Sequence, residues 1–332
     1  MNGAPQFPVL VERFFVRRLM QERGVSPHTI ASYRDTFRLL LDFAQRQLHK
    51  HPCDLSIPDL DAQLIVQFLN DLETTRTASA STRNLRLTAI RSFFRFVAAE
   101  RPEYLASTQR ILAIPSKRCA KPEVTYLTRA ECQALVASPD VKTWIGRRDR
   151  TLLLLAVQSG LRLSELISLD RQSVVPGPGA HVRCHGKGRK ERCTPLTREV
   201  ARELSAWLKE PTQGSCDALF PTVPGQRMSA DTIQRLLAKH ISTARQQCPS
   251  LKHKRVTPHT LRHAAAMELL QAGVDTSVIA LWLGHESVVS TQRYLHAHIA
   301  LKEAALAKTT PLDVAPARFR PGDRLLQFLS TL

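Results

Sequence analysis

The sequence predicts a mainly α-helical protein that carries one small antiparallel β-sheet. Apolar residues recur at helical spacing through most of the chain, and only residues 173–196 alternate and turn like short strands. The chain of 332 residues is long enough for two domains. We therefore expect a helical domain at 1–104, a linker at 105–122, an α+β domain at 123–310 and a tail at 311–332.

Four helices are predicted in the first domain. The first spans about 9–23 and stops at Gly24, and the second starts at Ser26-Pro27. The third spans about 60–73. The fourth, at about 81–99, combines an apolar stripe with four arginines, which fit either a solvated face or a surface that faces DNA; they are Arg83, Arg86, Arg91 and Arg95.

The second domain follows a stretch without periodicity. Pro, Ser and Lys punctuate residues 102–122, as in interdomain linkers. Thr128-Arg-Ala-Glu131 has the pattern of a capping box and opens the domain. A hairpin tip is expected at Gly186-Lys187-Gly188. Helices are predicted at about 129–137, 143–159, 163–168, 197–209, 229–246, 259–272, 275–283 and 287–297.

The composition favours a polyanionic partner. The net charge is +18 and the pI about 10.2, and Lys or Arg that neutralise phosphates release counterions. Anionic lipid is the rival partner, but no basic amphipathic helix stands out. We expect no membrane association, because no apolar run approaches the roughly 20 residues of a membrane span. The seven cysteines are odd in number and lack a CxxC pair, which indicates reduced cytoplasmic thiols.

Two motifs of the second domain bring basic side chains to unusual places. In SGLRLSEL, Arg162 lies at a helix start, where the helix dipole disfavours a cation unless an anion binds there. A plain ion pair with Glu165, three residues on, is the alternative. In HGKGRKER, the glycines allow a tight turn from which Lys187 projects. A solvated turn lysine is the alternative there.

Two further motifs supply histidines, an arginine and a tyrosine. In TPHTLRHAAA, residues His259, Arg262 and His263 fall on the first turns of a helix. A metal site is not expected, since no HExxH glutamate or third ligand accompanies the histidines. In LGHESVVSTQRYLHAH, Tyr294 follows His285 by nine residues, and a tyrosine that only packs its ring is the alternative.

Together these residue types suit covalent phosphoryl transfer on a nucleic acid without a metal. Arginines offer rigid forks to phosphate oxygens. Lysine can give a proton to a leaving oxygen, and histidine can accept one near neutral pH. A tyrosine becomes a nucleophile where cations lower its pKa or a base takes its proton.

In order and spacing, these residues resemble the signature of the tyrosine recombinase (phage integrase) family, above all Xer-like, integron and phage integrases. The resemblance extends to SGLRLSELISL, GKGRKER, PHTLRHAAAMELLQAG and LGHESVVSTQRYLH. It covers about residues 9–300 and is strong in the second domain. It implies a SAM-like core-binding domain that clamps DNA, followed by a tyrosine-recombinase catalytic domain.

The resemblance also implies a role for each signature residue. Tyr294 is the nucleophile that forms a 3′-phosphotyrosyl bond, and Arg162 and Arg262 hold the phosphate oxygens. Lys187 protonates the 5′-oxygen. The remaining roles are those of His259 as base or hydrogen-bond donor, His285 as phosphate ligand, Glu165 as the group that orients Arg162, and His263 as structural support.

The implied partners are double-stranded DNA and further copies of the chain, four protomers assembling on two DNA sites. A C-terminal helix, for which 301–308 is the candidate, docks on the next subunit. No cofactor, metal or ATP is implied, and the expected location is the cytoplasm, at the nucleoid. The residues expected to contact DNA are Arg83, Arg86, Arg91, Arg189, Lys190 and Arg192.

Three functions fit these features. The first is a site-specific recombinase that integrates, excises, resolves or transposes DNA. The second is a type IB topoisomerase-like enzyme with the same chemistry but usually no tetramer. The third is a DNA-binding regulator that has lost catalysis, against which the intact signature counts.

Overall fold

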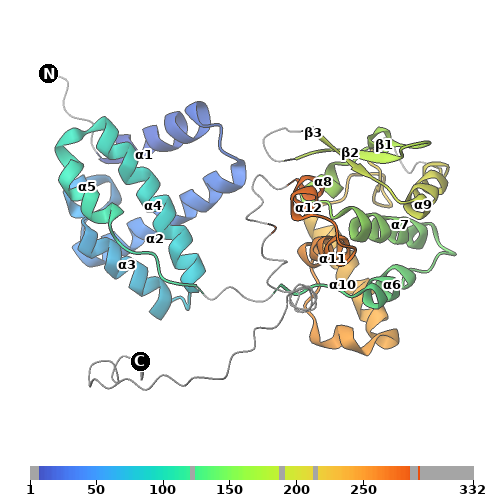
Figure 1. Cartoon of the computed structure of the whole chain (residues 1–332). Helices are drawn as coiled ribbons and strands as arrows, with labels where there is room; N and C mark the ends of the chain where they lie inside the picture. Colours follow the sequence, from blue (N-terminus) through green and yellow to red (C-terminus); the bar gives the residue numbers. More distant parts are fainter. Residues whose placement is uncertain (1–6, 120–123, 187–190, 212–215, 285–290, 292–332) are drawn as a thin grey trace, which may run out of the picture. The chain divides into compact units, whose positions relative to one another are not determined.

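The chain folds into two compact units, residues 1–122 and 123–332 (Figure 1). The computed structural model describes residues 7–119, 124–186, 191–211, 216–284 and 291. The predicted mainly α-helical fold with one small antiparallel sheet is confirmed. No helix within these described ranges is long and apolar enough to cross a membrane.

The described part of the first unit is helical. Serine or aspartate side chains cap three of its helices: Ser26, Asp61 and Ser79 each accept a backbone N–H three residues on. Its elements are α1 (Phe7–Arg13), the π-helical η1 (Phe14–Glu22), α2 (Pro27–Leu48), α3 (Ala62–Thr74), α4 (Ala80–Glu100) and α5 (Leu105–Leu112), with short 3-10 turns η2 (Pro52–Asp54), η3 (Ile57–Asp59) and η4 (Pro102–Tyr104).

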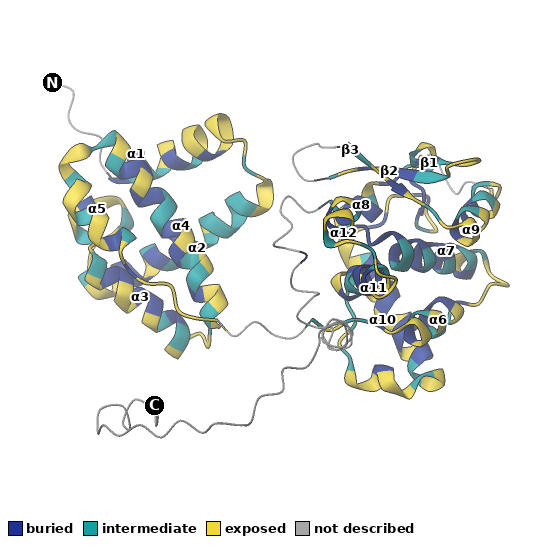
Figure 2. Ribbon diagram, in the orientation of Figure 1, coloured by how far each residue is buried: buried dark blue, intermediate teal, exposed yellow. Residues whose placement is uncertain are grey.

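An aromatic cluster forms the centre of the first unit's core. Phe14 is fully buried, and its ring lies 5.4 Å from that of Phe93 and 6.2 Å from that of Phe37. Figure 2 shows the buried residues on the faces that the helices turn toward one another. Large buried rings dominate the energetics of a core, so residues from η1, α2 and α4 hold this unit together.

The region predicted as a linker is partly folded. Residues 105–112 form α5, and Ile111 and Ile114 are buried in the core of the first unit. Asn84 of α4 donates to the carbonyl of Lys117 at 2.8 Å and accepts from its N–H at 3.0 Å. The expectation of a linker that begins at 105 is therefore wrong: scattered Pro and Ser residues obscured the few apolar positions that anchor this helix.

The second unit opens with the predicted capping box. Thr128 and Glu131 satisfy each other's backbone N–H groups at the start of α6. The helices of this unit are α6 (Arg129–Ala137), α7 (Trp144–Ser159), α8 (Leu163–Ser168), α9 (Arg198–Leu208), α10 (Ala230–Gln247), α11 (Pro258–Gln271) and α12 (Thr276–Leu283), with 3-10 turns η5 (Arg171–Ser173) and η7 (Pro249–His253).

The sheet consists of β1 (Val174–Val175), β2 (His181–His185) and β3 (Glu191–Pro195) in antiparallel order. Cys184 of β2 pairs with Arg192 of β3, and β2 contacts α8 (Figure 1). Helix α7 is largely buried and contacts α6, α9 and α11. Its C-terminal end, the start of α8, the start of α11 and the end of α12 meet at the site described below.

Replacing Ile111 tests whether α5 belongs to the first core. Ile111→Ala should lower the free energy of opening of α4 by about 2–5 kcal/mol, because Ile111 is 1% exposed and leaves a cavity. Native-state hydrogen exchange of the α4 amides measures this change.

Leu105→Ala is the matched control on the same helix, since Leu105 is 48% exposed. It should change the opening free energy by less than about 0.5 kcal/mol. An equally small effect of Ile111→Ala would mean that α5 contributes nothing to the core.

Candidate active site

The turn between α7 and α8 places Arg162. Gly160 ends α7 with a left-handed φ of 61°. A Cβ atom at this position would lie 2.7 Å from a methyl carbon of Leu283 and 3.1 Å from the Cβ of Ala265. Glycine is therefore required both by the backbone conformation and by the close approach of α11 and α12.

Arg162 is the N-cap residue of α8 and pairs with Glu165. Its backbone N–H donates to Oε2 of Glu165 at 2.7 Å, and its guanidinium donates to Oε1 at 2.8 Å. The ion pair considered as an alternative in the sequence therefore exists, and it orients the guanidinium. The side chain of Arg162 is 29% exposed, whereas that of Glu165 is 2% exposed. A ligand can therefore reach the side chain of Arg162, whereas that of Glu165 is inaccessible.

Helix α11 presents His259 and Arg262. Thr257 caps the helix and Pro258 is its first residue, one position before the predicted start at about 259. His259, in the first turn, is exposed. One turn later Arg262 is buried, and it donates to the carbonyl of Gly160 at 2.6 Å and to that of Leu283 at 2.5 Å.

The C-terminal end of α12 brings three arginines together. Arg192 donates to the carbonyl of Trp282, Arg262 to that of Leu283, and Arg162 to that of Gly284 at 2.6 Å. Three successive carbonyls therefore accept hydrogen bonds from guanidinium groups of three different elements. We call these three residues, Arg162, Arg192 and Arg262, the arginine cap. The last carbonyls of a helix lack intrahelical donors and carry the negative end of its dipole. Cations are therefore stabilised here.

Glu165 supplies the compensating negative charge. Burial raises its pKa, but hydrogen bonds from Arg192 and from the backbone of Arg162, with the charge of Arg192, outweigh burial and hold the pKa below its ordinary value. The carboxylate is thus ionised and accepts from both arginines, each at 2.8 Å.

Several predicted site residues lie outside the described residues. These are Lys187, Arg189 and Lys190 at the hairpin tip, and His285 and Tyr294 after α12. The predicted helix at 287–297 and the tail at 311–332 also lie outside them, apart from Thr291. His263 is half-buried on α11 and is engaged with other groups. Among the described residues no group of three or more His, Cys, Asp or Glu side chains is arranged to hold a metal ion.

Three arginines of α4 that were expected to contact DNA instead bind their own unit. Arg83 is 5% exposed and lies 3.5 Å from a carboxylate oxygen of Glu73. Arg86 donates to the carbonyl of Ser32 at 2.9 Å, and Arg91 donates to the carbonyl of Ile114. The DNA-facing interpretation is wrong for Arg83, since its guanidinium is inside the fold.

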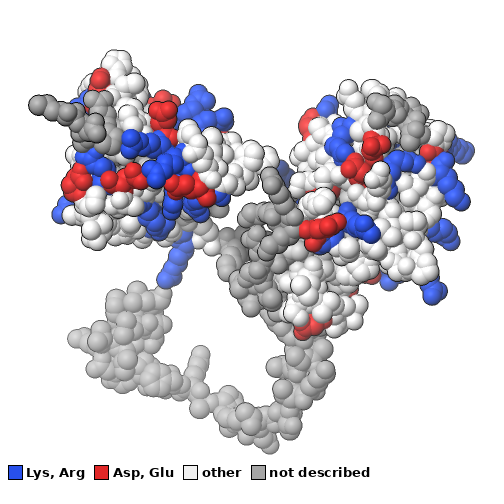
Figure 3. Space-filling model, turned by 90° about the horizontal axis from the view of Figure 1, so that it is seen from above, with Lys and Arg blue, Asp and Glu red and all other residues white. Residues whose placement is uncertain are grey.

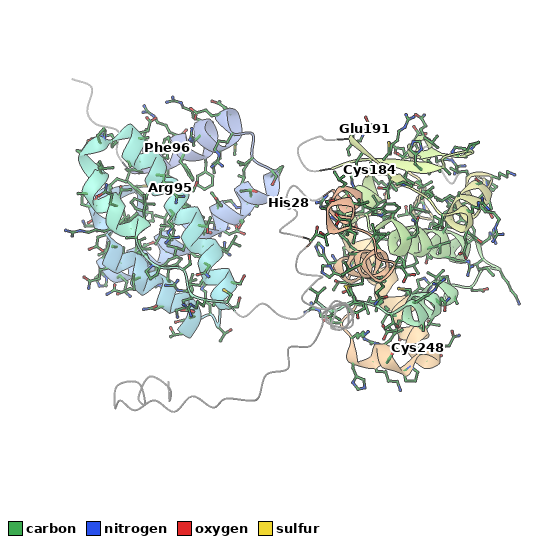
Figure 4. The ribbon with its side chains drawn as sticks, in the orientation of Figure 1. His28, Arg95, Phe96, Cys184, Glu191 and Cys248 are labelled. Atoms are coloured by element: carbon green, nitrogen blue, oxygen red, sulfur yellow. The ribbon has the colours of Figure 1, made fainter. Side chains whose placement is uncertain are left out.

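Arg95 is the exception on α4. It is exposed, next to the buried Phe96 (Figure 4). Figure 3 shows Lys and Arg side chains interspersed with Asp and Glu on the visible face of each unit. Of the four arginines on α4, Arg95 is therefore the exposed one.

Arg192 was also expected to contact DNA, and its surroundings contradict that role. Its side chain is 13% exposed, and it pairs with Glu165 and α12. A signal was present in the sequence: Arg192 and Thr194 are two apart on a strand and so share one face, and Thr194 is fully buried.

Comparison with known proteins gives consistent matches along the chain. Residues 125–300 match the phage integrase family, and residues 12–101 match the phage integrase N-terminal SAM-like domain. The chain is 57% identical to y4rC of Sinorhizobium fredii, named as an integrase/recombinase, over 97% of each chain. It is 32% identical to the tyrosine recombinase XerC of Pelotomaculum thermopropionicum, over 87% of this chain and 93% of the relative.

Solved structures share the fold. The XerH site-specific recombinase in a post-cleavage complex with palindromic difH substrate superimposes with a TM-score of 0.68 at 21% identity, over 85% of this chain and 80% of that one. A lambda integrase tetramer bound to a Holliday junction gives a TM-score of 0.62 at 17% identity, over 88% and 78% of the two chains.

Glu165→Gln tests the charge balance of the site. The variant should unfold with a free energy about 3–5 kcal/mol lower at pH 7, because two partly buried arginines lose the buried carboxylate that pairs with both. The contribution of the carboxylate is present above its unfolded pKa of about 4.3 and is lost as pH falls through the lower folded pKa. Stability should therefore fall less steeply below pH 4.3 in the variant than in the wild type.

Urea unfolding followed by tryptophan fluorescence measures both effects, since Trp144, Trp207 and Trp282 all lie in the second unit. Equal pH dependence of the two proteins would show that Glu165 is not held ionised by the arginines.

Proposed function

The chain belongs to the phage integrase family of tyrosine recombinases, and on this premise we propose how its residues cut and rejoin DNA. The protein is a site-specific DNA recombinase. The observation that carries the residue assignment is the arginine cap, which brings Arg162 and Arg262 to neighbouring carbonyls although they come from different helices.

Arg162 and Arg262 bind the scissile phosphate. Guanidinium groups match two phosphate oxygens at once, and positive charge fixed in a site with little water stabilises a pentacoordinate transition state strongly. Glu165 keeps Arg162 in one orientation, so the reorganisation on binding is small. The half-exposed Arg162 meets the phosphate first, and the buried Arg262 forms the floor of the site.

Tyr294 attacks the phosphate and becomes joined to the 3′ side through a phosphotyrosyl bond, while the 5′-oxygen leaves with a proton from Lys187. The exposed His259 accepts the phenol proton or donates a hydrogen bond to the phosphate, and His285 binds a phosphate oxygen. The 5′-hydroxyl of a partner strand then attacks the phosphotyrosyl bond. Because one phosphodiester replaces another, the cycle needs no ATP and no metal.

Double-stranded DNA is the substrate, and four copies of the chain bring two sites together. In such a tetramer two protomers cleave DNA at each strand exchange while the other two are inactive. Lambda integrase likewise binds a Holliday junction as a tetramer. The segment 301–308 docks on a neighbouring protomer. The protein works in the cytoplasm at the nucleoid.

The helical unit binds the same duplex as the second unit, so that the two units together clamp DNA. Within it, exposed arginines such as Arg95 contact phosphates, whereas Arg83, Arg86 and Arg91 support the fold. Arg189 and Lys190, beside Lys187 in the sequence, contact the backbone near the cleavage point. Phosphate contacts of this kind set register and affinity rather than sequence preference.

Trapping the covalent adduct tests the chemistry. A library of nicked suicide duplexes should yield a protein–DNA adduct through Tyr294, because the short cleaved fragment diffuses away and religation fails. Sequencing the attached DNA identifies the site. Tyr294→Phe should bind the same DNA and give no adduct, since the ring remains and the nucleophile is lost.

Each alternative predicts its own outcome in this experiment. Relaxation of supercoils without a preferred sequence would indicate a topoisomerase-like enzyme. Firm DNA binding without any adduct would indicate a regulator.

Arg95→Gln tests the clamp. Loss of one phosphate contact should weaken binding to all duplexes alike and reduce the slope of log Kd against log salt by about 1. Fluorescence anisotropy with two unrelated duplexes at several salt concentrations measures this. Glu12→Gln, another exposed change in the same unit, is the control; an unchanged salt slope for Arg95→Gln would exclude Arg95 from the interface.

A further inference from the structure

Arg192 connects three parts of the second unit that are distant in sequence. From β3 it donates to Oε2 of Glu165 at 2.8 Å, next to the start of α8. It donates to the carbonyl of Trp282 at the end of α12, and to the hydroxyl of Thr194 on its own strand at 3.2 Å. One guanidinium thus joins the sheet, the Arg162–Glu165 pair and the last turn of α12.

Arg192 also packs closely against Gly284. A Cβ atom at Gly284 would lie 3.0 Å from both Cδ and Nε of Arg192. Gly284 also has a left-handed φ of 63°. The Nε atom is buried, with no hydrogen-bond partner among the described residues. Gly284 therefore lies directly against the arginine, and the chain continues from there into His285.

The positions of Arg162 and Arg192 depend on each other, because both pair with the same carboxylate. Glu165 is buried and forms ion pairs with both Arg162 and Arg192. If Arg192 withdrew, Arg162 would be the partner left to the carboxylate among the described residues, and the Arg162–Glu165 pair would shift. A lysine cannot replace Arg192, because its single ammonium lacks the planar fork that reaches a carboxylate and a helix carbonyl together.

We propose that Arg192 is a positioning residue that holds Arg162 and the end of α12 in one fixed arrangement, so that the phosphate-binding arginine and the segment leading to Tyr294 are presented together. This inference rests on the proposed function. Arg192 itself contacts no DNA, because its side chain is 13% exposed and its donors face Glu165, Thr194 and Trp282.

The kinetic test uses Arg192→Lys and, as a matched control, Arg183→Lys on the exposed face of the neighbouring strand β2. Single-turnover cleavage is measured with saturating protein on the duplex recovered from the adduct experiment. Arg192→Lys should cleave about 10- to 100-fold more slowly, the loss typical of a catalytic group misplaced by about 1 Å. Its Kd for DNA should be unchanged, and Arg183→Lys should match the wild type.

A second substrate separates Arg192 from the leaving-group step. In a duplex with a 5′-bridging sulfur, the leaving thiolate needs no proton, so the defect of Lys187→Ala should disappear. The defect of Arg192→Lys should persist, because it acts on the phosphate-binding side. If the sulfur substrate restored cleavage by Arg192→Lys, Arg192 would act through Lys187. If Arg192→Lys bound DNA with a weaker Kd but cleaved normally at saturation, Arg192 would be a DNA contact. Either result overturns the proposal.

The double variant tests the route through Glu165. Adding Arg192→Lys to Glu165→Gln should slow cleavage much less than it slows the wild type, since both changes break the same contact. If the decrease in cleavage rate of the double variant equalled the product of the decreases of the two single variants, Arg192 would act independently of Glu165, contrary to the proposal.

Hydrogen exchange tests the contact with α12 without relying on activity. In the full chain, Arg192→Lys should speed exchange of amides in residues 276–284 by about tenfold or more, the factor for losing a hydrogen bond to a charged group. Arg183→Lys should leave them unchanged, and unchanged exchange in both variants would refute the contact. If the wild type forms no adduct, the proposed chemistry fails, and this measurement still decides whether Arg192 holds α12.

Discussion

The second unit depends on one electrostatic arrangement: three guanidinium groups at the C-terminal end of α12, balanced by the buried carboxylate of Glu165. The three arginines alone would repel one another. The helix dipole and the open carbonyls of residues 282–284 provide the negative partial charge, and Glu165 provides the full charge. The three guanidinium groups are consequently held in place by contacts within the second unit itself.

Two glycines make this arrangement sterically possible. Gly160 lets α11 and α12 approach the end of α7, and Gly284 lets Arg192 lie against the chain that leaves α12. Both also adopt left-handed conformations that favour glycine. The two glycines therefore lie where the helix ends meet the arginine cap, and their conformation and lack of a side chain allow these contacts.

The first unit uses its arginines in a different way. On α4, Arg83, Arg86 and Arg91 bind a glutamate and backbone carbonyls and so fasten α2 and the stretch after α5 to the helix. These side chains have structural partners within their own unit, and in the described part of the chain only Arg83 is paired with a carboxylate. The net charge of +18 therefore does not by itself identify the residues that contact a partner.

The sequence alone determined most of the described helices, the antiparallel strands and the capping box at Thr128, because these depend on spacing along a few turns. It also placed Arg162 beside Glu165. Only the tertiary structure decided that residues 105–112 belong to the first core, that Arg83, Arg86 and Arg91 of α4 bind groups of their own unit, and that Arg192 pairs with Glu165. The physical reason is that an arginine's partner lies far away in the sequence, and composition and periodicity carry no record of such contacts.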